Sequence, residues 1–112
     1  MRSVRWLRRA TAATAAALLC NVAGAQVRFD AEQINQGHVQ FHRTCAQCHG
    51  RNMVNSGTTV YDLRRFPLDQ PDRFFSSLSN GKGNMPSFKD ALTPEQMQLL
   101  WAYVGSRGGK EP

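Results

Sequence analysis

The sequence predicts a small all-α domain of three or four short helices joined by long loops. Three helical patterns stand out between loops that hold glycine, proline and asparagine, and no repeat or run of alternating strand residues accompanies them. A length of 112 residues with 41% hydrophobic residues suits one packed domain rather than a disordered chain. So many loop residues leave little apolar area to bury, which predicts a core completed by a bound group.

The first 25 residues have the pattern of a secretory signal peptide. Residues 1–9 contain four arginines and no acid, residues 10–20 are rich in alanine and leucine, and Ala-Gly-Ala follows at 23–25. A basic start, a short apolar run and a small-x-small end are typical of export signals. We expect cleavage after residue 25, a periplasmic product, and two units: a signal at 1–25 and one domain at 26–112.

Removal of the signal peptide changes the net charge and the cysteine count of the chain. The whole chain has 14 Lys+Arg, 8 Asp+Glu and a net charge of +6. Four arginines and one of the three cysteines lie in the signal, so the mature charge is about +2 and two cysteines remain. This balance does not predict a nucleic-acid partner. No apolar run reaches the roughly 20 residues of a membrane-spanning helix, so no stable membrane insertion is expected.

A first helix is predicted from Asp30 to Arg43. Asp30 is a suitable N-cap residue, and Ile34 and Phe41 are among the apolar residues of the segment. Gly37 inside a helix costs about 1 kcal/mol relative to alanine. A glycine at that position predicts that another element packs closely against this face.

A short helix is predicted at residues 71–78, with Asp69 as a plausible cap and Asn80-Gly81 as its end. The stretches 51–59 and 80–86 are rich in asparagine, serine and glycine and are expected to be loops.

The last helix has the clearest start signal. Thr93 is an N-cap residue, Pro94 occupies the first helical position, and Gln96 stands three residues after the cap. Met97, Leu100, Trp101 and Val104 follow at helical spacing, and Gly105 ends the pattern.

The strongest motif is C-x-x-C-H at residues 45–49, which indicates attachment of a c-type haem. Cys45 and Cys48 face one side of a helical turn, so their thiols can add to the two vinyl groups of one porphyrin. His49 follows directly and is predicted to be the proximal iron ligand.

Three alternatives to haem attachment remain open for these cysteines. A disulfide between residues three apart would close a small, strained loop. A redox pair of the thioredoxin kind is expected in a βαβ context, which this sequence lacks. Zinc could recruit His38 and His42, but zinc sites usually separate their two ligand pairs by about a dozen residues.

Met85 is the predicted second axial ligand. It lies in a glycine-rich loop that would allow the backbone close to the porphyrin, and Pro86 stiffens the chain beside it. Met53 is only four residues past His49, and Met97 belongs to the apolar face of the last helix.

A His/Met pair fills both axial positions of the iron and raises its reduction potential. We therefore expect an electron carrier rather than an enzyme. The alternative is a haem sensor or enzyme in which Met85 is a labile ligand.

From about residue 29 to 108 the chain resembles the class I c-type cytochromes. The motif at 45–49, the Met-Pro loop and residues of the first and last helices carry the resemblance: Gly37, Phe41, Leu100 and Tyr103. It implies the cytochrome c fold, with short helices and loops wrapped round one covalent haem c. It also implies that the first and last helices cross at Gly37.

Tyr61 stands where this family usually has a proline whose carbonyl holds the axial histidine. The resemblance implies that the Tyr61 carbonyl accepts the His49 N–H and that Leu63 packs on the haem.

The segments 59–66 and 80–86 are similar to small periplasmic cytochromes that are paired with PQQ-dependent alcohol dehydrogenases. This similarity implies a monomeric carrier that takes electrons from a quinoprotein dehydrogenase and passes them toward a terminal oxidase. The alternative is a general respiratory cytochrome with another donor.

Overall fold

The computed structural model describes residues 28–55 and 59–112, and the predicted signal at 1–25 lies outside them. In these residues the helices are α1 (Ala31–Thr44), α2 (Ala46–His49), α3 (Pro71–Asn80) and α4 (Pro94–Gly105). Two short 3₁₀ helices, η1 (Arg51–Met53) and η2 (Leu63–Arg65), lie in the connections. The described residues form no strand, apart from one isolated bridge between Lys82 and Met85. The prediction of an all-α fold is thus confirmed.

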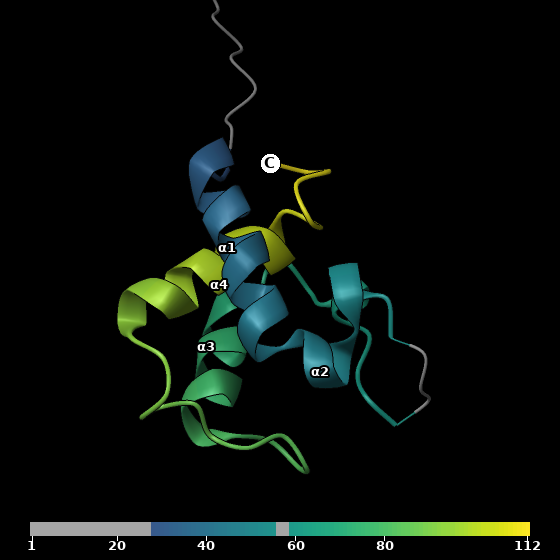
Figure 1. The fold of residues 1–112 in the computed structure, drawn as a ribbon, viewed down its shortest axis with the longest axis vertical. Coiled ribbons are helices and arrows are strands. Elements are labelled where there is room, and N and C mark those ends of the chain that lie inside the picture. Colours follow the sequence, from purple (N-terminus) through teal and green to yellow (C-terminus); the bar gives the residue numbers. More distant parts are fainter. Residues whose placement is uncertain (1–27, 56–58) are drawn as a thin grey trace, which may run out of the picture.

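The α1 and α4 helices cross at Gly37 (Figure 1). A Cβ atom at this position would overlap the carbonyl oxygen of Leu99 and lie 2.9 Å from Cβ of Tyr103. Only glycine allows the two backbones so close, which confirms the close approach predicted from its place inside the helix.

Aromatic rings fill the space between α3, α4 and the segment that precedes α3. Phe66 meets Phe74 edge-on at 5.7 Å between ring centroids, and meets Trp101 in the same manner at 6.0 Å. Such edge-to-face pairs are favourable beyond the area they bury. The core also holds apolar residues from α1, α3, α4 and the loops: Phe41, Met53, Leu78, Leu92, Met97, Leu100, Tyr103 and Val104.

The helix starts follow the sequence signals in two of three cases. Asp30 accepts hydrogen bonds from the backbone of Glu32 and Gln33, and Thr93 and Gln96 form the reciprocal capping box. The prediction of Asp69 as the cap of α3 is wrong, because Gln70 holds the N-cap position there and makes no side-chain cap bond. Proline at the next position starts this helix, where its missing N–H costs nothing.

Candidate haem-binding site

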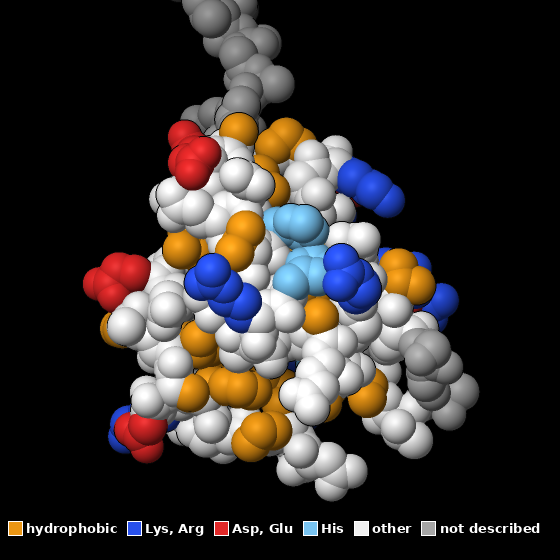
Figure 2. Space-filling view, viewed as in Figure 1, with side chains coloured by type: hydrophobic (Ala, Val, Ile, Leu, Met, Phe, Trp, Pro, Cys, Tyr) orange, Lys and Arg blue, Asp and Glu red, His pale blue; other side chains and the backbone are white. Residues whose placement is uncertain are grey.

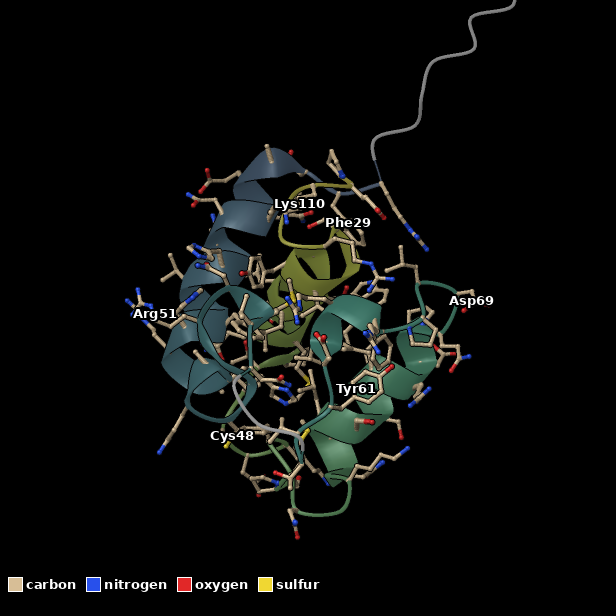
Figure 3. The ribbon with its side chains drawn as sticks, turned by 90° about the vertical axis from the view of Figure 1, so that its right-hand side faces the viewer. Phe29, Cys48, Arg51, Tyr61, Asp69 and Lys110 are labelled. Carbon is tan, nitrogen blue, oxygen red and sulfur yellow. The ribbon has the colours of Figure 1, made fainter. Side chains whose placement is uncertain are left out.

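The C-x-x-C-H motif forms the sharp turn between α1 and α2. Cys45 caps the end of α1, and its carbonyl oxygen accepts the N–H groups of Cys48 at 3.2 Å and His49 at 2.9 Å. These bonds wind the five residues into one helical turn. Both cysteines are free: Cys45 is half-buried and Cys48 is exposed (Figure 3). The turn therefore presents two free thiols and an imidazole from adjacent positions.

The two thiols differ in their surroundings. Burial, reinforced by the nearby Cys48, raises the pKa of Cys45 to about 12. Its thiol is therefore protonated at neutral pH and packs against the hydrophobic core as an apolar group.

His49 is held by the segment that leads into η2. Its Nδ1 lies 3.2 Å from the carbonyl oxygen of Tyr61. A carbonyl oxygen only accepts, so Nδ1 carries the proton and Nε2 keeps its lone pair. Burial lowers the pKa of His49, while the bond to Tyr61 opposes that effect. The result is a neutral imidazole with a free Nε2, the form that binds a metal ion.

Met85 lies in a tight loop after α3. The backbone groups of Lys82 and Met85 exchange two hydrogen bonds of 3.0 Å, and Gly81 has a φ of 73° that glycine adopts without strain. The backbone N–H of Phe88 donates to the carbonyl of Leu78 at 2.7 Å, which ties the loop to α3. Backbone bonds on both sides of Met85 thus fix the position of its backbone.

Half-covered apolar side chains lie near the motif and the loop that holds Met85. Hydrophobic side chains gather low on the face between the end of α1 and the loop after α3 (Figure 2). Partly buried residues of the motif, η2, α3 and the loops on either side of α3 pack against the core: Cys45, Ala46, Leu63, Leu68, Phe75, Met85 and Phe88. A group of half-exposed apolar side chains is typical of a surface that binds an apolar ligand. Free thiols, a neutral imidazole and an apolar wall are the groups that a covalent haem needs.

The zinc alternative finds no support in the described residues, because no three His, Cys, Asp or Glu side chains gather there. His42 is also engaged at both ring nitrogens. Its Nδ1 lies 2.8 Å from the carbonyl of His38, and its Nε2 accepts the backbone N–H of Asn52 at 3.0 Å. His38 Nε2 donates to the side-chain oxygen of Asn52 at 3.1 Å. The two histidines therefore hold the turn after the motif, a role that the sequence did not reveal.

One cavity lies away from the motif. It has a volume of about 580 Å³ and lies between the first half of α1, the turn at Asn52 and the chain end near Arg107. None of the residues 45–49 and 81–88 lines it. We assign the site to the half-covered surface instead, because that surface carries the thiols and the imidazole.

Asp62 fixes the start of η2. It directly follows Tyr61, whose carbonyl oxygen bonds to His49. Its carboxylate accepts the backbone N–H of Arg64 at 3.0 Å and pairs with the Arg64 guanidinium at 2.8 Å. Mainly through the side-chain bond from Arg64, the pKa of Asp62 falls to about 2 from its ordinary 3.8. This depressed pKa stabilises the fold above pH 3.8, and the contribution disappears as the pH falls toward 2.

Replacing Asp62 with asparagine will therefore weaken the protection of the Arg64 amide at neutral pH. Hydrogen exchange followed by NMR will show the difference from the wild type shrinking between pH 4 and pH 2, where Asp62 itself becomes neutral. Equal protection of the Arg64 amide in both proteins at pH 7 would rule this role out.

Comparison with known proteins gives the same result as the geometry. A family model described as cytochrome c oxidase, cbb3-type, subunit III matches residues 32–104. Cytochrome c6 of Nostoc sp. is 35% identical over 78 residues, which cover 66% of this chain and 69% of that protein. The chain belongs to the cytochrome c family. Cytochrome c6 of Gloeothece citriformis is a further relative. It is 33% identical over a stretch that covers 66% of this chain and 71% of that protein.

A second group of relatives consists of much larger enzymes. Quinohemoprotein alcohol dehydrogenase ADH-IIG of Pseudomonas putida is 36% identical over 70% of this chain, a stretch that makes up only 11% of the enzyme. A solved structure of quinohemoprotein alcohol dehydrogenase ADHIIG from P. putida HK5 matches with a TM-score of 0.64 at 32% identity. It covers 75% of this chain and 12% of the enzyme chain. This cytochrome therefore has the fold of one small part of that enzyme.

Membership of the family establishes the cytochrome c fold and a covalent haem c, and Cys45 and Cys48 have the spacing of the C-x-x-C-H attachment motif. The cytochrome is an electron carrier and not an enzyme. No helix in residues 28–55 and 59–112 has the length and apolar character needed to cross a membrane.

Proposed function

We propose that this cytochrome is a monomeric, periplasmic one-electron carrier with His49 and Met85 as its axial ligands. The observation that carries the proposal is the His49 ring, which the Tyr61 carbonyl orients with Nε2 free. The basic, alanine-rich start supports export and a mature domain at 26–112. Bound haem supplies a reversible one-electron couple, and the chain holds it and sets its potential.

The protein's own residues favour electron transfer over reaction with small molecules. The Tyr61 carbonyl fixes the His49 ring, so the proximal ligand does not need to reorganise. The hydrogen-bonded loop at 81–86 fixes the backbone of Met85, whose sulfur would hold the iron from the side opposite His49. A site with both positions filled leaves no room for oxygen or peroxide to bind.

We propose a quinoprotein alcohol dehydrogenase as the electron donor. The support is the similarity to part of quinohemoprotein alcohol dehydrogenase ADH-IIG, in which a domain like this one belongs to the enzyme chain. A free cytochrome of the same kind can receive electrons from a separate dehydrogenase and pass them toward a terminal oxidase. Such redox contacts are small and transient, usually below about 1,200 Å².

Stopped-flow mixing of the oxidised cytochrome with a substrate-reduced quinoprotein alcohol dehydrogenase tests the donor. We expect fast reduction whose rate rises with dehydrogenase concentration, and slower reduction by an unrelated flavoprotein dehydrogenase. Reduction at the same slow rate by both enzymes would leave a general carrier with another donor, as the cytochrome c6 relatives suggest.

A further inference from the structure

The side chain of Tyr61 makes a set of contacts that are separate from its carbonyl bond to His49. Its hydroxyl donates to the carbonyl oxygen of Arg65 at 3.3 Å, across the η2 turn. Its ring meets the ring of Phe66 edge-on at 6.3 Å. The residue is nevertheless 47% exposed, so burial alone does not hold it in place.

Arg73 of α3 connects this ring to the core. The guanidinium carbon lies 5.9 Å from the centroid of Tyr61 and 5.4 Å from that of Phe66, so one cation covers both rings. Nη1 of Arg73 also donates to the side-chain oxygen of Gln70 at 3.2 Å, which fixes the guanidinium at the start of α3. Phe66 in turn packs against Phe74.

The position of the Tyr61 carbonyl depends on these contacts. Tyrosine leaves the backbone dihedral φ free, whereas proline would fix it. A mobile backbone at residue 61 would move the oxygen that holds His49 Nδ1 at 3.2 Å. The Tyr61 hydroxyl is held by the Arg65 carbonyl and its ring by Phe66 and Arg73, and these contacts restrict that movement.

We propose that the side chain of Tyr61 is a positioning residue for the axial histidine. We call its contacts with Arg65, Phe66 and Arg73 the Tyr61 latch. By holding the carbonyl in place, the latch keeps the His49 ring oriented and increases its basicity toward iron. The proposal rests on the proposed function, in which His49 binds the iron.

The latch has a defined effect on the reduction potential. A hydrogen bond to Nδ1 makes the histidine a stronger donor and stabilises the oxidised iron. Loss of the latch therefore raises the potential. We expect Tyr61→Ala to increase the equilibrium constant for reduction about threefold or more, which is roughly 30 mV at 59 mV per tenfold change.

Four variants of the haem-loaded protein test the latch. Tyr61→Ala removes the ring. Tyr61→Phe keeps the ring contacts, and its reduction potential is expected to lie close to that of the wild type. Arg73→Gln removes the cation and shifts the potential in the same direction as Tyr61→Ala. Lys110→Gln removes one charge from an exposed lysine, which is well apart from Tyr61 in the view of Figure 3, and serves as the control.

Exchange of the His49 Nδ1 proton with solvent, followed by NMR, is the second readout. We expect exchange about tenfold faster in Tyr61→Ala than in the wild type, and unchanged in Lys110→Gln. Equal exchange rates and potentials in Tyr61→Ala and the wild type would overturn the latch. The absorption spectrum of the wild type reports separately whether Met85 binds the iron, so failure of the proposed ligand set is recognised independently.

Discussion

Replacing Met85 with alanine will open one axial position of the iron. Alanine has no donor atom, so the variant is expected to be high-spin and to bind carbon monoxide readily. Its reduction potential will fall below that of the wild type, because a thioether ligand raises the potential. The absorption band from the sulfur–iron bond in the oxidised protein will disappear. Absorption spectra with and without carbon monoxide measure both effects.

Met97→Leu is the matched control for Met85→Ala. Met97 is a buried methionine of α4, and leucine conserves its volume in the core. This variant should keep the sulfur–iron band and exclude carbon monoxide. If the band is lost in Met97→Leu and survives in Met85→Ala, then Met97 and not Met85 is the axial ligand. A wild-type protein that binds carbon monoxide readily would contradict Met85 as a stable axial ligand.

Replacing Gly37 with valine will destabilise the crossing of α1 and α4. Even one Cβ atom there overlaps the carbonyl oxygen of Leu99 and meets the Leu99 carbonyl carbon at 2.8 Å. These are backbone atoms, so relief requires the helices to separate. Overpacking of this kind costs about 1–3 kcal/mol, occasionally more. Urea unfolding should show this loss in the free energy of unfolding.

Gln36→Val is the control for Gly37→Val, because it places the same side chain at an exposed position of α1. Substitutions at such positions usually change stability by less than about 0.5 kcal/mol. Equal losses in the two variants would mean that the helix propensity of valine, and not the crossing, sets the cost at Gly37.

Features that depend on nearby residues could be predicted from the sequence. The capping box at Thr93 and the cap at Asp30 are local bonds with known residue preferences, and both are present. Gly37 predicted a close approach because it is costly in a helix, although the sequence did not show which atoms meet it. At α3, Pro71 fits the first position of a helix on its own, and the favourable cap residue Asp69 is not used.

In the candidate site, too, contacts between nearby residues could be predicted and contacts between distant residues could not. Cys45, Cys48 and His49 are contiguous, so their turn could be predicted from their spacing. The bond between His42 and Asn52 joins residues ten apart in the chain, through a left-handed turn with φ of 53° at Asn52. No residue preference at either position predicts that bond. The cation of Arg73 over Tyr61 is likewise a product of tertiary packing.

The intact mass of the exported protein tests the account most directly. We expect a chain that begins at residue 26 and carries one covalently bound haem per molecule. Cys45→Ala combined with Cys48→Ala should remove that added mass. A mature chain without added haem mass, whether its cysteines are free or joined in a disulfide, would contradict the account.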